Sequence, residues 1–315
     1  MKKVQDTNFL SEKTKSIYEK KILLAQNEIW TCDGSNAVSI STILRNPEDF
    51  AQKLSKYCSK KAGRMSSSCG DHYKDGIFSS LMALFLYNEK LKETEKPLFE
   101  RWKAQQKIIR EPIEHKYKSN VPTDRQRDAY MTFEEICDIR DSLPRGSQEK
   151  LLLCMYTMIP PVRSDYHHTK IYGKTPTPHP QGNFIVLTSK NPHIILQEYK
   201  TASKYNNIVT PVPPELYQEM IYSLAETPRK YLFTSPRTNQ PFEIPSTFNT
   251  WANRTLKTLT KKKNFSLTML RHIYITRRDL KLENKSGLEQ EEVAKQMGHS
   301  ITTLRRYMWH TYENQ

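Results

Sequence analysis

Strand-forming sequence is confined to three short runs, and this restriction limits the possible folds more than any other feature. The runs cover residues 184–187, 193–199 and 207–212; they are rich in β-branched residues and are separated by turn-forming ones. Elsewhere, apolar residues recur at the three- and four-residue spacing of helices. The sequence therefore predicts a mainly helical α+β protein with one small antiparallel β-sheet.

The helical pattern falls into two blocks on either side of a polar stretch that contains prolines. Residues 1–110 show helical spacing alone, whereas residues 127–315 contain helices and all three strand candidates. Between them, residues 111–126 include Pro112 and Pro122 among basic and polar residues, a composition typical of an extended, partly stiff linker. A chain of 315 residues is long enough to bury two separate cores.

Local signals indicate where several helices begin and end. Pro47 suits the first turn of a helix, and Thr132 with Glu135 forms the pattern of a capping box. Gly298 stands where the glycine that ends a helix is expected. The run 77–91 is the most apolar helical stretch of the N-terminal block, so we expect it to form the core of that block.

The chain is strongly basic along its whole length. Lysine and arginine number 49 against 34 aspartates and glutamates, which gives a formal charge of +15. Division at residue 126 leaves +7 on the N-terminal part and +8 on the C-terminal part, so the charge is not that of a basic tail. Two basic domains of similar charge fit a clamp around a polyanion, and nucleic acid is the usual polyanion for such a chain.

Composition argues against several other classes of protein. The longest apolar run, near residues 78–87, is too short to span a bilayer, and no apolar export signal follows the basic start, so we expect an intracellular protein without a membrane segment. Adjacent histidines such as His167 and His168 diverge on a regular element, so no metal site is expected there. The cysteines form no C-x-x-C pair, which argues against zinc modules and disulfides; they are Cys32, Cys58, Cys69, Cys137 and Cys154.

Five residues, mostly near the C-terminus, supply the groups that cleave a phosphodiester without a metal. Tyr307 could act as the nucleophile and form a covalent phosphoryl-enzyme. Arg163 and Arg271 could hold the non-bridging oxygens as charge develops. Lys200, at the end of a predicted strand, could protonate the leaving alkoxide. His299 could donate a hydrogen bond to the phosphate or accept the proton of the nucleophile.

In order and spacing, these residues resemble the active site of the tyrosine recombinases, also called lambda-type integrases. That family has an arginine in a first box, a lysine in a β-hairpin and a His-x-x-Arg box often followed by histidine. A Gly-His pair and a nucleophilic tyrosine come next. The resemblance covers residues 127–315, and the matching residues are Arg163, Lys200-Thr201, Leu270-Arg271-His272, Met297-Gly298-His299-Ser300 and Tyr307.

The resemblance implies a mechanism of DNA strand exchange that needs neither a metal nor ATP. Tyr307 would attack a phosphodiester of double-stranded DNA and form a 3′-phosphotyrosine intermediate. Arg163, Arg271 and His299 would stabilise the pentavalent phosphate. Lys200 would protonate the 5′-oxygen leaving group. No cofactor is implied.

The resemblance also implies an architecture and an assembly. Residues 1–110, with an N-terminal arm, would form a helical core-binding DNA domain, residues 111–126 the linker and residues 127–315 the catalytic domain. Four protomers would act together on two DNA sites, in the nucleus or cytoplasm of a host cell. The short spacing from the Gly-His box to the tyrosine resembles integrases of virophages and related eukaryotic mobile elements.

Several positions depart from the family pattern. Thr268 stands where the family usually has histidine, and its hydroxyl could donate to a phosphate oxygen but would be a poor general base. Either this box is weakened or another group, such as His272, compensates. Tyr166 stands where the family has glutamate, with Asp165 one residue earlier. Only eight residues follow Tyr307, which leaves little chain for exchange between protomers.

Two site residues have rivals close by in the sequence. Lys204 lies on the same predicted turn as Lys200, and Tyr312 is a second tyrosine near Tyr307 but lies too far from the Gly-His box. The run 261–263 of three lysines suits a solvated loop or one that contacts a DNA backbone.

Two other functions stay open from the sequence. A type IB topoisomerase would use the same chemistry but would relax supercoils without joining two DNA sites. A DNA-binding protein that has lost catalysis is the other alternative, and Thr268 is the feature that favours it.

Overall fold

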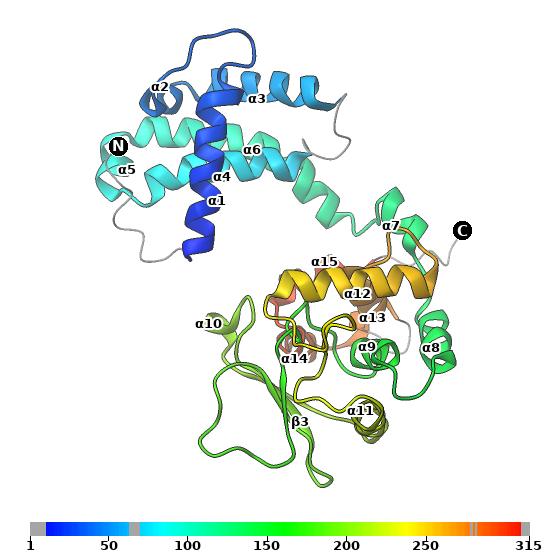
Figure 1. Ribbon diagram of the computed structural model, residues 1–315. Coiled ribbons are helices and arrows are strands. Elements are labelled where there is room, and N and C mark those ends of the chain that lie inside the picture. Colours follow the sequence, from blue (N-terminus) through cyan, green and yellow to red (C-terminus); the bar gives the residue numbers. More distant parts are fainter. Residues whose placement is uncertain (1–10, 63–69, 278–279, 281, 310–315) are drawn as a thin grey trace. The chain divides into compact units, whose positions relative to one another are not determined.

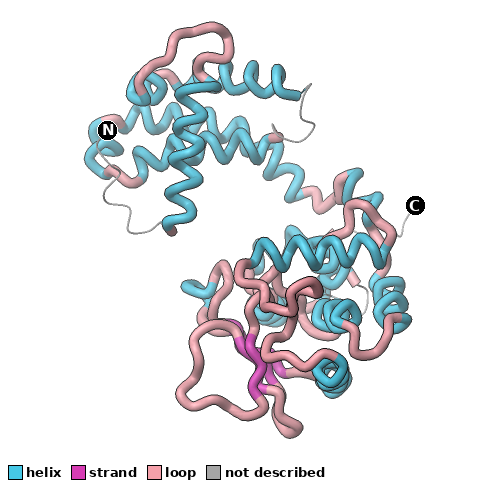
Figure 2. Tube along the Cα trace, viewed as in Figure 1, coloured by secondary structure: helices cyan, strands magenta, loops and turns pink. Residues whose placement is uncertain are grey.

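The computed structural model describes residues 11–62, 70–277, 280 and 282–309. The chain divides into two compact units, with the boundary between Ser119 and Asn120 (Figure 1). Among the described residues, all strands belong to the second unit, so the first is helical as predicted (Figure 2). The fold class expected from the sequence, mainly helical α+β with a small sheet, is therefore confirmed. Within the described part of the chain, no helix combines the length and the apolar character needed to cross a membrane.

The N-terminal unit packs its helices around a core of aromatic rings. The ring of Trp102 lies 5.7 Å from that of Phe50 and 5.2 Å from that of Phe78, and all three side chains are fully buried. Rings packed at such distances stabilise a core beyond their buried area alone. The elements are α1 (Glu12–Leu24), a π-helical turn η1 (Ala25–Ile29), α2 (Ile40–Arg45), α3 (Pro47–Ala62), α4 (Asp71–Leu86), α5 (Glu89–Thr94) and α6 (Lys96–Lys118).

The first half of the predicted linker, residues 111–118, is helical instead of extended, because α6 continues through Pro112 to Lys118. A proline inside a helix removes one backbone hydrogen bond, so other contacts must hold the helix together here. Arg110 of α6 forms an ion pair with Asp75 of α4 at 2.7 Å. Further along α6, the ring of Tyr117 lies 5.7 Å from the ring of His72, also on α4. These contacts with α4 keep the segment helical where composition predicted an extended chain.

Other helix ends follow the local signals, with one exception. Pro47 is the first residue of α3, and the capping box of Thr132 and Glu135 is present, with the backbone amide of Glu135 3.1 Å from the hydroxyl of Thr132. The apolar helix predicted over 77–91 stops at Leu86. The side chain of Asn88 accepts a hydrogen bond from a backbone amide three residues on and so begins a new helix, α5.

The C-terminal unit combines eight longer helices with a small sheet and short helical turns. Its described elements, in chain order, are α7 (Asp124–Ala129), α8 (Phe133–Ser142), α9 (Gln148–Thr157), β1 (Lys170–Tyr172), β2 (Phe184–Val186), β3 (His193–Leu196), α10 (Ala202–Tyr205), β4 (Ile208–Pro211), α11 (Pro214–Glu226), α12 (Pro245–Thr260), α13 (Leu267–Thr276), η3 (Leu282–Asn284), α14 (Gly287–Gln296) and α15 (Ile301–Tyr307).

The sheet has the order β1-β2-β3-β4 and is mixed. The three predicted runs form β2, β3 and β4, which pair antiparallel, with Ile185 opposite Ile194 and Ile194 opposite Thr210. The additional strand β1 pairs parallel with β2, so the expectation of a purely antiparallel sheet is corrected for this pair. Sequence analysis missed β1 because three residues beginning with a lysine show no strand pattern.

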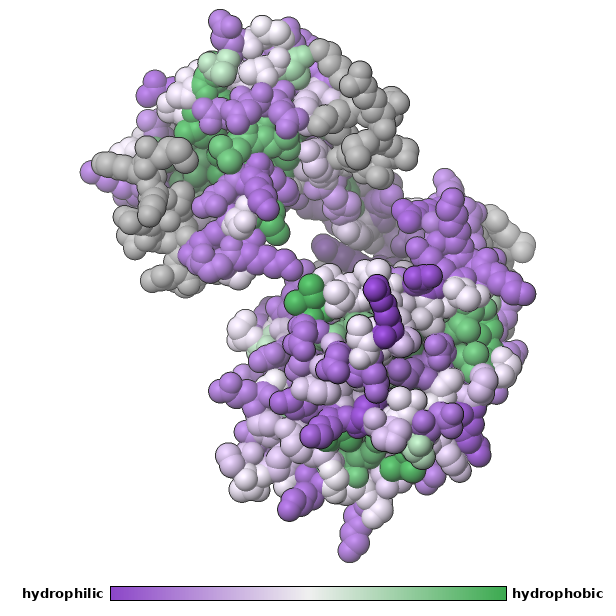
Figure 3. All heavy atoms as spheres, in the orientation of Figure 1, coloured by the Kyte–Doolittle hydropathy of each residue, from purple (hydrophilic) through white to green (hydrophobic). Residues whose placement is uncertain are grey.

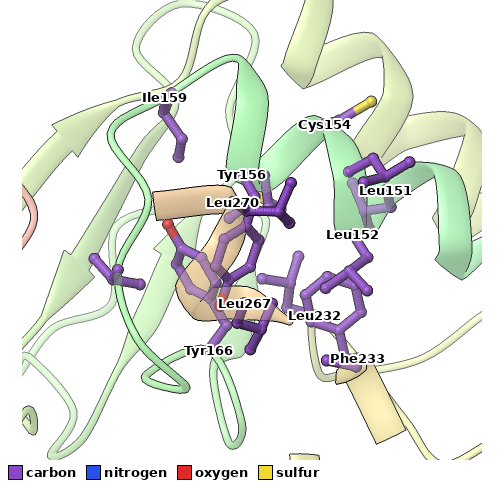
Figure 4. Close-up of a cluster of buried hydrophobic side chains, with 14 of the residues drawn as sticks. Leu151, Leu152, Cys154, Tyr156, Ile159, Tyr166, Leu232, Phe233, Leu267 and Leu270 are labelled. Carbon is purple, nitrogen blue, oxygen red and sulfur yellow. The ribbon is translucent and has the colours of Figure 1, made fainter. Parts of the chain in front are cut away.

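The core of this unit joins α9 to α13. Tyr156 of α9 and Leu270 of α13 are buried side by side, and Tyr166 packs edge to face on Tyr156 at 5.8 Å (Figure 4). Helices packed in this way are rigid supports, because close-packed interiors resist deformation. The core therefore fixes the loop that follows α9 relative to α13, the two segments that carry the arginines of interest.

Candidate active site

Helix α13 carries Arg271 into the interior of the C-terminal unit. The helix is capped by Ser266, whose hydroxyl accepts the amide of Met269 at 3.3 Å. Arg271 is only 1 % exposed, and its Nη2 donates to the carbonyl of Met297 at 3.4 Å, whereas its buried Nε has no hydrogen-bond partner. Burial lowers the pKa of Arg271 to about 10. The guanidinium is still charged at neutral pH, so the structure holds a buried cation with an unused donor.

The junction between α14 and α15 places His299 beside this cation. Gly298 ends α14 with φ of +67°, and the amide of His299 returns to the carbonyl of Ala294 at 3.0 Å, a Schellman motif. A Cβ added at Gly298 would lie 3.2 Å from the ring of Tyr199, so both the backbone angle and the space favour glycine. The predicted helix end is therefore confirmed, and it fixes the position of His299.

The protonation state of His299 follows from its contacts. Its Nδ1 lies 3.2 Å from the carbonyl of Ser300, and a carbonyl can only accept, so Nδ1 carries the hydrogen. Burial, reinforced by the charges of Arg271 and Arg163, lowers the pKa of His299 to about 3. The ring is therefore neutral at pH 7, and its buried Nε2, which has no partner, presents a lone pair.

Tyr307, the last residue of α15, lies against both groups. Its ring is nearly parallel to that of His299, with centroids 5.6 Å apart and an interplanar angle of 17°. The guanidinium carbon of Arg271 lies 4.8 Å from the centroid of the same ring. The structure thus brings together Arg271, His299 and Tyr307, three residues that the sequence predicted to share a site.

His272 and Trp309 hold the backbone of the predicted nucleophile. The Nδ1 of His272 donates to the carbonyl of Tyr307 at 2.8 Å, and its ring stacks on Trp309 at 4.1 Å. Burial, with a smaller contribution from the charge of Arg271, lowers the pKa of His272 to about 4, so the ring is neutral at pH 7. Sequence reasoning missed Trp309, because the family pattern ends at the tyrosine.

Arg163 reaches the same junction from the loop after α9. Its Nη1 donates to the carbonyl of Gly298 at 3.0 Å, next to the carbonyl that Arg271 contacts. The hydroxyl of Tyr156 donates to the carbonyl of Arg163, and the carboxylate of Asp165 accepts its backbone amide at 3.0 Å. Burial raises the pKa of Asp165. Tyr166, which stands where the family has glutamate, is buried in the core and does not replace a carboxylate.

Lys200 lies in an exposed turn after β3, and the residues on either side of it contact Gly298. The hydroxyl of Thr201 donates to the carbonyl of Gly298 at 2.9 Å, and the ring of Tyr199 lies against the same glycine. The rival Lys204 lies further on, in α10, with its ammonium 5.2 Å from the ring of Tyr205. The contacts of Tyr199 and Thr201 therefore hold the backbone around Lys200 beside Gly298, whose carbonyl Arg163 also contacts.

Thr268 stands apart from this group. It is exposed in the first turn of α13, three residues before Arg271 and therefore on a similar side of the helix. Among the described residues, no hydrogen bond joins Thr268 to the other predicted site residues. Tyr312, the rival nucleophile, lies outside the described residues.

The remaining polar clusters do not resemble a metal site. Within the ranges that the structure describes, no group of three or more His, Cys, Asp or Glu side chains is placed to hold a metal ion. His167 bonds to the carbonyl of Ser164 at 3.1 Å, whereas the ring of His168 packs on Tyr231 at 4.7 Å. The two neighbouring histidines thus diverge.

Comparisons with known proteins give little further guidance. The sequence matches no protein-family model and no curated protein. Among solved structures, the crystal structure of XerA recombinase aligns over 95 % of this chain and 95 % of its own, with a TM-score of 0.43 and 13 % identity. A likeness at this level shows neither a family nor an activity.

Proposed function

We propose that this protein is a site-specific DNA recombinase, an integrase, that cuts and rejoins double-stranded DNA through a 3′-phosphotyrosine at Tyr307. The convergence of Arg163, Arg271 and His299 beside that tyrosine carries the proposal. Arg163 and Arg271 are more than 100 residues apart in the sequence, yet they donate to the adjacent carbonyls of Gly298 and Met297 at the end of α14. Buried polar atoms without a partner, such as Arg271 Nε and His299 Nε2, are rare in proteins, and a bound phosphate would supply partners for both.

The proposed cleavage step exchanges one phosphodiester for another. The phenol oxygen of Tyr307 forms a bond to phosphorus, and the bond from phosphorus to the 5′-oxygen breaks. Arg163 and Arg271 stabilise the charge on the non-bridging oxygens, which is usually the largest contribution in such sites. Lys200 gives its proton to the departing 5′-oxygen. Because the phosphotyrosine keeps a phosphodiester bond, rejoining needs no ATP.

His299 and Thr268 have smaller roles in this mechanism. The neutral His299 has a lone pair on Nε2, with which it can accept the proton that leaves the phenol of Tyr307. A bound phosphate would favour the protonated ring, which could then donate to an oxygen. Thr268, exposed in the first turn of α13, would at most donate its hydroxyl hydrogen to a phosphate oxygen.

The partners follow from the charge and from the reaction. Both parts of the chain are basic, at +7 and +8, which suits duplex DNA as the substrate. Joining two DNA sites requires more than one active protomer, and we propose a tetramer on two sites. Integration of a mobile or viral element into host DNA, in the nucleus or the cytoplasm, is the proposed setting.

A plasmid assay tests the activity without a known target site. Wild-type protein and Tyr307→Phe are incubated with supercoiled plasmid in EDTA without ATP, and the reaction is stopped with detergent. The proposal predicts relaxed plasmid or protein bound covalently to DNA for the wild type alone. Activity that persists in the variant would remove Tyr307 from the mechanism.

Two further outcomes separate the alternatives. Relaxation without any joining of two DNA molecules would favour a topoisomerase over a recombinase. DNA binding without adduct in either protein would favour an inactive DNA-binding protein, unless Thr268→His, made next, restores adduct formation.

A further inference from the structure

Among the described residues, none forms a hydrogen bond or an ion pair that would fix the ammonium group of Lys200. Its side chain is exposed. A general acid must lie within hydrogen-bond reach of the oxygen that it protonates, and displacements of about 1 Å can cost on the order of 10²-fold in rate. Its position must therefore come from the residues that hold its turn.

Asn183, which immediately precedes β2, holds one end of this turn. The side chain is 6 % exposed and makes four hydrogen bonds. Its Nδ2 donates to the carbonyls of Asp165 at 2.8 Å and Glu198 at 2.9 Å, and its Oδ1 accepts the amides of Gln197 and Glu198, both at 2.8 Å. The buried side chain of Asn183 thus connects Asp165, two residues after Arg163, to Glu198, two residues before Lys200.

Thr201 holds the other end of the turn. Its hydroxyl donates to the carbonyl of Gly298 at 2.9 Å, and the same oxygen accepts Nη1 of Arg163 at 3.0 Å. A carbonyl oxygen has two lone pairs, and this one uses both. The turn that carries Lys200 is therefore bonded on both sides to the segments that carry Arg163 and His299.

Resting on the function proposed above, we infer that Asn183 and Thr201 are positioning residues that set Lys200 against the leaving 5′-oxygen. Neither side chain touches the reacting atoms in this mechanism. Both act through the placement of the Lys200 ammonium, so their loss impairs the proton transfer that completes cleavage. Arg163 stays bonded to Gly298 without Thr201, so its contribution to charge stabilisation is retained.

A substrate whose leaving group needs no proton distinguishes the positioning of Lys200 from a general loss of structure. Only a general loss of structure would slow cleavage of that substrate. Duplex pools carry one defined linkage flanked by random sequence, so that no target site has to be known. In one pool the linkage has its natural 5′-oxygen, and in the other a bridging 5′-sulfur. A thiol has a pKa of about 8.5 and leaves as a thiolate, whereas an alkoxide requires protonation. Covalent adduct formation is timed for the full-length wild type and each variant on both pools.

The variants are chosen to keep the fold. Thr201→Val retains the shape of the side chain and removes the hydroxyl, while Thr201→Ser restores it. Asn183→Asp keeps the two accepted hydrogen bonds and loses the two donated ones. Thr188→Val, in the β2–β3 turn at the other end of the same sheet, is the matched control.

We expect Thr201→Val, Asn183→Asp and Lys200→Ala to form adduct on the order of 10²-fold slower than wild type on the oxygen pool. On the pool with the bridging 5′-sulfur, their rates of adduct formation come within a few-fold of the wild-type rate. Arg163→Ala stays slow on both pools. Thr201→Ser and Thr188→Val match wild type. Equal slowing of Thr201→Val on both pools, or no slowing on either, would overturn the inference while the proposed function stands. No adduct from wild type on either pool would overturn both.

Discussion

The two sides of the candidate site are built in opposite ways. On the helical side, formed by α13, α14 and α15, Arg271 and His299 are 1 % and 2 % exposed and pack against the ring of Tyr307. On the sheet side, Lys200 is exposed, and its turn is held by hydrogen bonds of Asn183 to Gln197 and Glu198 and by one hydrogen bond from Thr201 to Gly298. The surface view likewise shows mostly hydrophilic side chains on the visible face of the C-terminal unit (Figure 3).

This difference matches the tasks that the two sides would perform. Charge stabilisation is strongest where fixed groups act in a buried, low-dielectric place, which describes the helical side. A general acid has to deliver a proton and recover another from water, which suits an exposed lysine on a turn. The helical side should therefore dominate the reaction rate, whereas the sheet side should respond to small changes in its hydrogen bonds.

The largest effect is expected when the buried cation of the helical side is removed. Arg271→Ala should slow adduct formation on the order of 10²–10³-fold, the typical cost of losing one donor to a developing anion. Arg271→Lys should recover little, because an ammonium lacks the fork of the guanidinium. The measurement is a quenched time course of adduct formation, with DNA binding measured in parallel.

Arg229 provides a matched control for that experiment. Arg229 is also partly buried, and burial lowers its pKa to about 10, as for Arg271. Unlike Arg271, whose buried Nε has no partner, it donates hydrogen bonds to the carbonyls of Ser223, Thr227 and Leu232. Arg229→Ala should lower stability and leave the rate per folded molecule unchanged. An Arg271→Ala enzyme as fast as wild type would show that the helical side is structural.

Acid should destabilise the helical side through its two buried histidines. The pKa values of His272 and His299, about 4 and about 3, lie below the value near 6.5 of an unfolded histidine. As the pH falls below 6.5, the unfolded chain therefore binds protons that the folded chain does not, and stability is lost down to the folded pKa values. At pH 5 each histidine should cost about 2 kcal/mol of unfolding free energy.

Denaturant unfolding at pH 7.5 and pH 5 measures this loss. The variants His272→Gln and His299→Gln should each reduce the difference between the two pH values, because glutamine does not titrate. A difference that is the same in both variants and in wild type would mean that these rings are not buried as neutral groups.

The smallest effect is expected at Thr268. Because this side chain is exposed and makes no hydrogen bond to the other site residues in the described structure, Thr268→Ala should change the rate of adduct formation by less than about tenfold, equivalent to 1.4 kcal/mol. The same time course measures it, with Thr258→Ala on the exposed side of α12 as the comparison. A loss of 10²-fold or more would place Thr268 on the helical side as a working donor.

Sequence patterns predicted those parts of the molecule that depend on local signals. The runs that form β2, β3 and β4 have β-branched residues and turn signals, and Gly298 ends its helix as its position predicted. The prediction of an extended linker failed over residues 111–118, which are helical. Arg110 and Tyr117 contact α4, a helix distant in sequence, and these contacts outweigh the local effect of Pro112.

The candidate site shows the same division. Arg271, His299 and Tyr307 could be selected by order and spacing, and the structure brings them into contact. Asn183 and Trp309 could not, because an asparagine that joins two loops and a tryptophan that stacks on a histidine have no sequence signature. The exposure of Thr268 also depends on how α13 packs, which no local pattern shows.

The central claim is that Tyr307 forms a covalent bond to DNA, and the most direct measurement identifies the modified residue. Wild-type protein trapped on plasmid in EDTA is digested with nuclease and protease, and its peptides are analysed by mass spectrometry. The account predicts a nucleotide attached through phosphate to Tyr307 and to no other residue. A nucleotide on Tyr312 or on any other side chain of a trapped adduct would contradict it.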